Sequence, residues 1–159
     1  MTTVYVSIGS NIDRERNMRA AIESLRARFG PVTVSSTYES ESVGFAGDNF
    51  YNTVAAFDTD LAAGAVIDIL RSIEAQQGRV RDGERFASRT LDIDLLLYGD
   101  LVEHSDTLDV PPAELEKYAF VLLPLSEIAP DLRHPETGVT FANMWRGFRQ
   151  RGQRLWRVE

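Results

Sequence analysis

Cysteine is absent from this sequence of 159 residues. Its absence excludes disulfide bonds, thiolate metal sites and a cysteine nucleophile. No apolar run approaches the length that a membrane-spanning helix requires, and the first residues lead into an expected strand without the pattern of a secretory signal. Basic residues are fewer than acidic ones, 17 against 24, so the net charge is −7. A general nucleic-acid binder would show a basic face. We therefore expect a cytoplasmic protein that binds neither membranes nor nucleic acid.

The composition that is present is typical of a soluble globular protein, with 43% hydrophobic and 26% charged residues. A chain of this length is long enough for one domain with a proper core and too short for two ordinary domains. The sequence contains no internal repeat, low-complexity segment or linker. Residues 1–159 are therefore predicted to form a single domain.

Hydrophobic periodicity predicts six main elements in the order strand, helix, strand, strand, helix, strand. They cover residues 3–8, 14–29, 32–38, 50–58, 61–77 and 91–98. This is the order of an α+β, ferredoxin-like β-α-β-β-α-β sandwich, with helices on one face of an antiparallel sheet. Additional C-terminal helices are expected over 112–118 and 120–128, residues 140–148 are expected to form part of a tail that packs back on the domain, and flexible loops are expected over 39–49 and 80–89. Gly9-Ser10-Asn11 is predicted as a strand-to-helix turn, with phosphate binding there as the weaker interpretation.

Two aspartates in the last expected strand carry the most specific chemical signal. Asp92 and Asp94 are two residues apart, so their side chains project from the same face. Two carboxylates on one face of an apolar strand repel each other and are costly without a cation. Mg²⁺ bound together with substrate phosphates suits this arrangement, because it takes one or two protein carboxylates and fills its other positions with phosphate and water oxygens.

Four arginines precede these aspartates, at positions 79, 81, 85 and 89. Guanidinium groups suit the non-bridging oxygens of a polyphosphate. The acidic strand and the arginine-rich loop together indicate metal-assisted phosphoryl or nucleotidyl transfer. The alternative is that the aspartates pair with these same arginines and that no metal is involved.

Three further polar or aromatic positions have both a functional and a structural interpretation. Asn52 shares a strand face with Phe50, so an amide and a ring could together bind a heterocycle, although an asparagine in such a position is more often a satisfied strand-end residue than a ligand. Glu74 lies in the last turn of its expected helix, where the helix dipole disfavours a negative charge. Something nearby is expected to compensate this charge, and Arg79 and Arg81 are taken as the candidates. A salt bridge would explain Glu74, and a role at a nucleotide site is the alternative.

The stretch Arg85-x-x-x-Arg89-x-x-Asp92-Ile93-Asp94-Leu95-Leu96 resembles the signature of the 6-hydroxymethyl-7,8-dihydropterin pyrophosphokinase family. The resemblance covers nearly the whole chain in the family's order. It includes Val4-Tyr5-Val6-Ser7-Ile8-Gly9-Ser10-Asn11, Ser35-Ser36-x-Tyr38, Asn52, Glu74-x-Gln76-Gln77-Gly78-Arg79-x-Arg81 and Phe120-x-Leu122-x-Pro124-Leu125-x-Glu127-Ile128-Ala129-Pro130. It implies transfer of diphosphate from ATP to the hydroxymethyl group of 6-hydroxymethyl-7,8-dihydropterin in folate biosynthesis, with AMP and the pterin diphosphate as products.

The resemblance also implies site residues and ligands. Asp92 and Asp94 would bind two Mg²⁺ ions, with ATP as co-substrate, and Arg81 and Arg89 would be catalytic. The expected ATP-binding residues are Glu74, Arg79, Arg81, Arg85 and Arg89. The expected pterin-binding residues are Val43, Gly44, Phe50, Asn52, Phe86 and Phe120. The partners would be these small molecules, and the protein would be a monomer or a weak homodimer.

Several positions depart from the family pattern on the ATP side. Pro112 stands where a histidine is usual, Tyr118 where a basic residue is usual, and Thr107 where an arginine is frequent. Asp109 adds a negative charge in place of a small hydroxyl residue. These departures leave open a divergent paralogue that binds pterin with weak or no ATP-dependent activity. An RNA-binding module on the same fold is the third hypothesis, and the acidic composition argues against it.

Overall fold

The computed structural model describes residues 1–41, 47–77, 91–149 and 152–158. None of the helices within these ranges is both long enough and apolar enough to cross a membrane. The elements in chain order are β1 (Thr2–Ser10), α1 (Arg14–Phe29), β2 (Thr33–Val34), β3 (Tyr38–Ser40), β4 (Phe50–Thr59), α2 (Ala63–Gln76), β5 (Asp92–Tyr98), β6 (Glu103–His104), β7 (Asp109–Val110), α3 (Glu114–Lys117), α4 (Ala119–Ile128), α5 (Phe141–Arg146) and β8 (Leu155–Arg157).

The main sheet has the strand order β5-β1-β4-β3-β8, with β2 paired to β4 beside β3. Every pairing in it is antiparallel. The first four strands in this order, together with α1 and α2, form the expected β-α-β-β-α-β unit. The α+β, ferredoxin-like fold predicted from the sequence is therefore confirmed.

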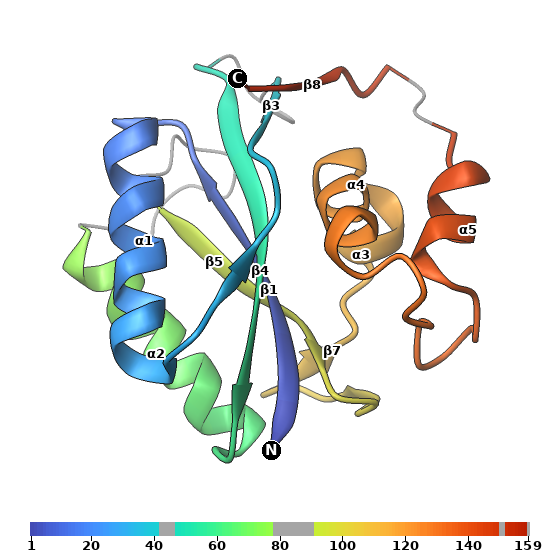
Figure 1. The fold of residues 1–159 in the computed structure, drawn as a ribbon, viewed down its shortest axis with the longest axis horizontal. Helices are drawn as coiled ribbons and strands as arrows, with labels where there is room; N and C mark the ends of the chain where they lie inside the picture. The colour runs from blue at the N-terminus through green and yellow to red at the C-terminus, as the bar shows by residue number, and fades with distance from the viewer. Residues whose placement is uncertain (42–46, 78–90, 150–151, 159) are drawn as a thin grey trace.

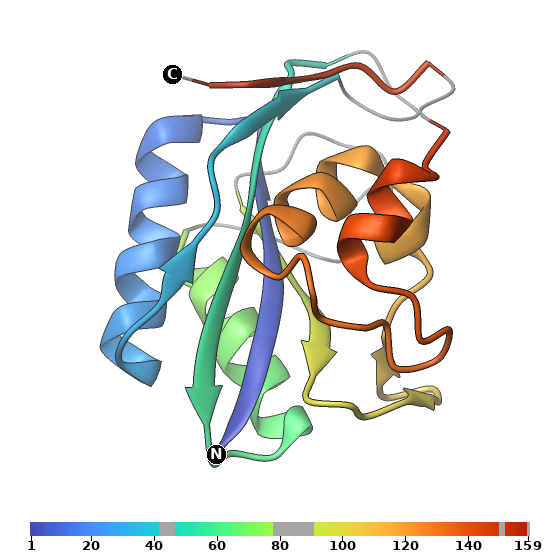
Figure 2. The ribbon, with the colours of Figure 1, turned by 45° about the vertical axis from the view of Figure 1, so that its right-hand side comes forward.

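Helices cover both faces of this sheet (Figures 1 and 2). α1 and α2 pack on one face, where Val4, Val6 and Ile8 of β1 are buried against the apolar sides of both helices. α3, α4 and α5 pack on the other face, over Val54 and Leu96. Burying an aliphatic side chain of this size contributes about 1.5–3 kcal/mol. The additional C-terminal helices thus form a second apolar core, which leaves both sides of the sheet covered.

The second expected strand, over residues 32–38, is divided into β2 and β3. Ser35 lies at the break, and its backbone N–H donates to the carbonyl of Val54 at 2.9 Å. Its hydroxyl accepts from the backbone N–H of Val54 at 2.9 Å and contacts the Thr53 hydroxyl at 2.8 Å. A side-chain oxygen here takes the place of a backbone carbonyl in the pairing with β4, so the regular strand is interrupted at Ser35.

The first strand is longer than its apolar pattern indicates. Gly9 and Ser10 belong to β1, where they pair with Asn52 and Tyr51 of β4, so the predicted turn over Gly9-Ser10-Asn11 begins only after Ser10. The α1 helix starts where the sequence predicts, but its N-cap residue, Asp13, makes no side-chain capping hydrogen bond.

The C-terminal segment connects two parts of the molecule. Strand β8 pairs with β3 and extends the sheet on that side (Figure 2). Ahead of it, the Gln153 side chain accepts from the backbone N–H of Ala119 at 2.7 Å and donates to the carbonyl of Lys117 at 2.9 Å. These two bonds fix the junction between α3 and α4 on either side of Tyr118.

Glu127 of α4 is the main polar connection between the second helical layer and the sheet. One carboxylate oxygen accepts from the backbone N–H and the hydroxyl of Ser36, at 2.8 and 3.1 Å, and the other accepts from the Tyr38 hydroxyl at 2.6 Å. Burial and the bond to Glu127 raise the pKa of Tyr38 to about 12. Burial acts to raise the pKa of Glu127, but the hydrogen bonds from Tyr38 and Ser36 outweigh it and leave the pKa lowered.

Replacement of Glu127 by Gln is expected to lower the free energy of unfolding at pH 7 by about 1 kcal/mol, because these charge-assisted bonds are weakened. A carboxylate whose folded-state pKa is lowered stabilises the fold above its unfolded-state pKa and loses that contribution as the pH falls through the folded-state value. The difference between wild type and variant should therefore shrink from pH 7 to pH 3. Urea unfolding at both pH values measures it, and a constant difference would contradict this role.

Candidate active site

The described residues line a cavity of about 660 Å³ on the sheet face that α3 and α4 cover. This volume is in the range of small-molecule binding sites. Strands β1, β4 and β5 form one wall, and α2, α3, α4 and the segment from Ser105 to Pro112 contribute the others. The sequence-predicted residues Phe50, Asn52, Asp92, Asp94 and Phe120 all line it.

The strand register explains why these residues meet. Gly9 of β1 is paired with Asn52 of β4 on one side and with Asp92 of β5 on the other, so the three positions form a row across adjacent strands. A Cβ atom at Gly9 would lie 3.5 Å from Oδ1 of Asn52 and 3.8 Å from the Phe50 ring. The absence of a side chain at Gly9 therefore keeps the sheet surface open between the amide and the aspartate.

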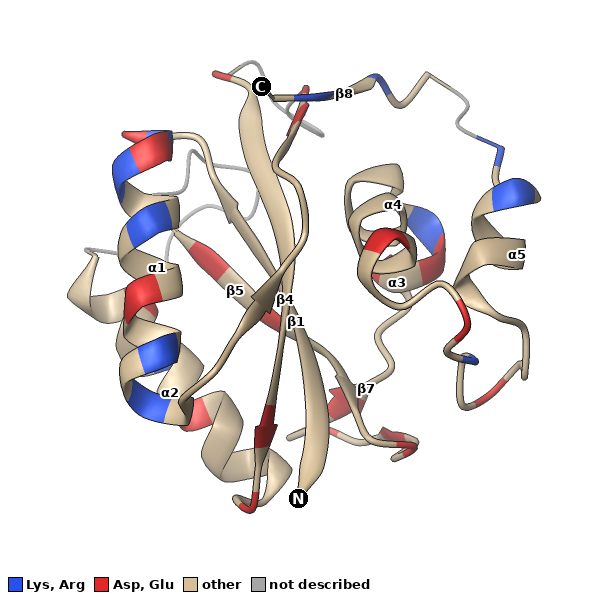
Figure 3. Cartoon of the chain, viewed as in Figure 1, with Lys and Arg blue, Asp and Glu red and all other residues tan. Residues whose placement is uncertain are grey.

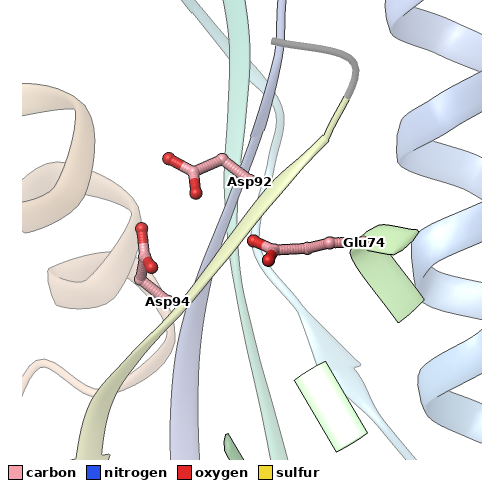
Figure 4. Close-up of side chains that lie close together, drawn as sticks. All are labelled: Glu74, Asp92 and Asp94. Carbon is pink, nitrogen blue, oxygen red and sulfur yellow. The ribbon is translucent and has the colours of Figure 1, made fainter. Parts of the chain in front are cut away.

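Three carboxylates gather beside this row. Oxygen atoms of Glu74, Asp92 and Asp94 all lie within 4.8 Å of one another. Asp92 and Asp94 extend together from one side of β5, whereas Glu74 reaches the strand from α2 (Figure 4). Side chains alternate between the two faces of a strand, so residues two apart share a face. The prediction that Asp92 and Asp94 share one face is therefore confirmed. An all-oxygen set of carboxylates is suited to a hard divalent cation such as Mg²⁺.

Glu74 is almost fully buried, with 1% of its surface exposed. One of its carboxylate oxygens accepts from the backbone N–H of Ile93 at 2.7 Å. The other forms an ion pair with the Arg71 guanidinium at 2.8 Å. The charge of Glu74 is thus compensated by Arg71, three residues earlier on the same helix, whereas Arg79 and Arg81 lie outside the described residues.

Arg71 lines the cavity and was not identified from the sequence. Besides Glu74, it contacts the carboxylate of Asp94 at 3.3 Å and donates to the carbonyl of Ile93 at 2.8 Å. The spacing of three residues from Glu74 places both side chains on one helix face, and this was the signal available in the sequence. Asp94 is therefore paired with an arginine of α2, and the predicted pairing with arginines 79–89 lies outside the described residues.

Aromatic rings and an amide also line the cavity. Phe120 stacks on Tyr118 with ring centroids 5.0 Å apart and planes inclined by 19°. Asn52 donates from its amide nitrogen to the Ser40 hydroxyl at 2.8 Å and to the Tyr38 carbonyl at 3.2 Å. Strand β3 therefore holds the amide in place, with Oδ1 on the side of Gly9. A flat heterocycle with polar edges suits this combination of ring and amide.

The four positions that depart from the family pattern also line the cavity, namely Thr107, Asp109, Pro112 and Tyr118. The added charge of Asp109 is engaged by His104, whose Nδ1 lies 2.6 Å from its carboxylate, while Nε2 of His104 lies 3.0 Å from Glu136. These two hydrogen bonds raise the pKa of His104. The imidazole thus offsets the extra acid at this end of the cavity.

Seven of the sequence-predicted site residues fall outside the residues that the structure describes. They are Val43, Gly44, Arg79, Arg81, Arg85, Phe86 and Arg89. Their expected roles therefore stay predictions. Figure 3 shows several basic residues of the described ranges on α1, which packs on the face of the sheet opposite the cavity, whereas Arg71 of α2 contacts Asp94 of β5.

Comparison with known proteins identifies relatives over most of the chain. Residues 5–130 match the family described as 7,8-dihydro-6-hydroxymethylpterin-pyrophosphokinase (HPPK). A 2-amino-4-hydroxy-6-hydroxymethyldihydropteridine pyrophosphokinase of Pseudomonas aeruginosa is 43% identical over 137 residues, which cover 84% of each chain. The Haemophilus influenzae protein of the same name is 36% identical over 143 residues, covering 87% of this chain and 89% of its own.

Solved structures agree with the fold. The HPPK-DHPS of Plasmodium falciparum superimposes with a TM-score of 0.72 at 13% identity, covering 92% of this chain. Another HPPK-DHPS, crystallised with substrates, gives a TM-score of 0.72 at 12% identity. The present chain spans 43% of the length of each of these two proteins. At this identity the likeness shows the fold alone.

The open surface at Gly9 gives a direct test of the cavity. Gly9→Leu should extend a side chain between Asn52 and Asp92 and reduce binding of 6-hydroxymethyl-7,8-dihydropterin by roughly tenfold or more, because the ligand loses contact area. Gly9→Ala is the matched control, since its Cβ would meet only ordinary van der Waals contacts. Calorimetric titration measures both, with thermal unfolding as the check of the fold. Unaltered pterin binding in the leucine variant would contradict this location.

Proposed function

The chain belongs to the 7,8-dihydro-6-hydroxymethylpterin-pyrophosphokinase family, and we propose from its described residues how it carries out the family's reaction. It is an ATP-dependent diphosphotransferase of folate biosynthesis, which transfers diphosphate from ATP to the hydroxymethyl group of 6-hydroxymethyl-7,8-dihydropterin. The observation that supports the residue roles best is the position of the carboxylate cluster, on the same cavity wall as Asn52 and one strand away from Gly9.

Attack of the pterin hydroxyl on the β-phosphorus of ATP breaks the bond between the α- and β-phosphates and leaves AMP. Such a displacement depends on in-line positioning and on charge neutralisation more than on a strong base. The cavity supports this mechanism, because its lining includes the Phe120 ring and the Asn52 amide, the two aspartates of β5 and the four positions that depart from the family pattern.

Asp92 and Asp94 are proposed to hold Mg²⁺ through their carboxylate oxygens, and two ions remain the proposed number. Glu74 lies close enough to take part, but both of its oxygens already bond to Ile93 and Arg71. We propose that Glu74 supports the nucleotide site indirectly, by holding β5 through Ile93 and by orienting Arg71. When bound, Mg²⁺ supplies positive charge that screens the triphosphate from the aspartates and stabilises charge at the transferred group.

The pterin is proposed to lie between Phe120 and the Phe50 ring, with the Asn52 amide at its edge. The Asn52 nitrogen is engaged by β3, so its Oδ1 is the atom that we expect to accept hydrogen bonds from the pterin's donor groups. Val43, Gly44 and Phe86 complete this proposed set. Holding the ring flat against the sheet fixes the hydroxymethyl group relative to the aspartates, which is the positioning that the displacement requires.

ATP is proposed to bind at the end of the cavity that Thr107, Asp109, Pro112 and Tyr118 line. Arg79, Arg81, Arg85 and Arg89 are proposed to contact its phosphates, with Arg81 and Arg89 acting on the transferred group. The binding-only paralogue considered from the sequence gains no support from the relatives, which are named as pyrophosphokinases. The small-molecule substrates are the partners, and the monomeric or weakly dimeric state and the cytoplasmic location stay predictions.

A turnover assay with Mg²⁺, ATP and 6-hydroxymethyl-7,8-dihydropterin tests the roles of the aspartates. The wild type should release AMP, and formation of ADP would contradict diphosphate transfer. Asp92→Asn and Asp94→Asn should each lower kcat/KM by roughly a hundredfold or more, because an amide is a far poorer ligand for the cation that neutralises the triphosphate.

Asp68→Asn provides the matched control, because Asp68 is an exposed aspartate of the neighbouring helix α2. It removes the same charge without touching the cavity lining, and its kcat/KM should stay within about twofold of wild type. If the control loses as much activity as the β5 variants, net charge rather than the proposed site is responsible. If both β5 variants retain full activity, these aspartates do not hold the cation.

A further inference from the structure

Arg71 and Glu74 of α2 form a network of four contacts that connects α2 to β5. The Arg71 guanidinium bridges Glu74 of its own helix, at 2.8 Å, and Asp94 of the strand, at 3.3 Å. It also donates to the Ile93 carbonyl at 2.8 Å, while Glu74 accepts from the Ile93 N–H at 2.7 Å. β5 is the last strand of the described sheet on this side. The two side chains of α2 therefore satisfy both backbone polar groups of Ile93 that would otherwise point outward from the sheet.

The same guanidinium is part of the acidic cluster's electrostatics. Two of the three carboxylates of the cluster, Glu74 and Asp94, are ion-paired with Arg71. A divalent cation that binds beside Asp94 is repelled by a guanidinium at this distance and must share Asp94 with it. Arg71 therefore opposes cation binding to the nucleotide-free protein.

The backbone of Asp94 does not depend on Arg71 for its position. It is held by the pairing of β5 with β1, in which Ser7 is its register partner. The bond between Asp94 and Arg71 is the longest of the four contacts, and the Asp94 side chain is 45% exposed. Removing the arginine should consequently leave the carboxylate on the same face of β5 while removing the repulsion. Electrostatic competition, rather than side-chain positioning, then decides the effect on cation affinity.

A triphosphate reverses the sign of this interaction. Its negative charge attracts the guanidinium that repels the bare cation, so Arg71 favours the cation and nucleotide together over the cation alone. We propose that Arg71 is a resident counter-cation of the acidic cluster, which keeps divalent-cation binding weak until the nucleotide is present. This inference rests on the proposed cation site at Asp92 and Asp94, and it adds a residue that controls when that site is filled.

The test is titration of the protein with Mn²⁺, with the unbound ion followed by its electron paramagnetic resonance signal. Each variant is titrated alone and with α,β-methylene-ATP, in which the bond broken by the reaction is replaced. In Arg71→Gln, Mn²⁺ should bind the nucleotide-free protein roughly fivefold or more tightly than in wild type. The increase in Mn²⁺ affinity that α,β-methylene-ATP produces should therefore be smaller in Arg71→Gln than in wild type.

Two controls separate the local charge from other effects. Arg71→Lys retains the positive charge and should keep wild-type Mn²⁺ affinity. Arg26→Gln removes the same charge from an exposed position on α1 and should also behave as wild type. Circular dichroism and thermal unfolding check the fold, and Arg71→Met serves as a second neutral variant if the glutamine variant does not fold.

Unchanged or weaker Mn²⁺ binding in the neutral Arg71 variants would overturn the inference, and equal tightening in Arg26→Gln would do the same. Asp92→Asn, titrated alongside, distinguishes this failure from that of the proposed function. If Asp92→Asn loses Mn²⁺ binding while Arg71→Gln changes nothing, only the role of Arg71 is wrong. If Asp92→Asn binds Mn²⁺ as wild type does, the proposed cation site is itself wrong.

Discussion

The repulsion between two carboxylates on one face of β5 is the constraint on which the site depends. Asp92 and Asp94 point toward the cavity, and Glu74 brings a third carboxylate within 4.8 Å of them. Such a cluster is costly unless positive charge compensates it. In the described residues Arg71 supplies part of that charge, and a bound cation is the proposed supplement. The repulsion within the cluster lowers the stability of the fold, but the same carboxylates can hold the cation that neutralises a triphosphate. Functional sites commonly contain such locally unfavourable arrangements.

The sheet gives this cluster its geometry. β1 lies between β4 and β5, so a single residue without a side chain, Gly9, separates the amide of Asn52 from the carboxylate of Asp92. The helices on the first face stabilise the sheet from behind, and those on the second face supply Phe120 and Tyr118 as a wall of the cavity. Contacts from Glu127 and Gln153 fix that second layer to β3 and to the C-terminal segment. The site is therefore built from side chains on strands and helices that are each held by packing on two sides.

The sequence predicted the parts of this structure that depend on local pattern. Apolar periodicity located α1 to the residue, and the spacing of Asp92 and Asp94 indicated their shared face. Contacts between residues that are distant in the sequence could not be predicted from local pattern. The break at Ser35 comes from hydrogen bonds to β4, the coverage of the second face comes from α4 and α5, and β8 exists only through its pairing with β3. Arg71 was missed because its partners Asp94 and Ile93 lie on another element. The single-domain arrangement of residues 1–159 and the roles of the 79–89 arginines stay predictions.

Crystals grown with Mn²⁺ and a non-reacting ATP analogue offer the most direct test, because anomalous scattering locates the ion without assumptions about the protein. The account predicts a peak within coordination distance of carboxylate oxygens from both Asp92 and Asp94, in contact with the triphosphate. A triphosphate-bound ion coordinated away from these two aspartates, with Asp94 still paired to Arg71, would contradict it.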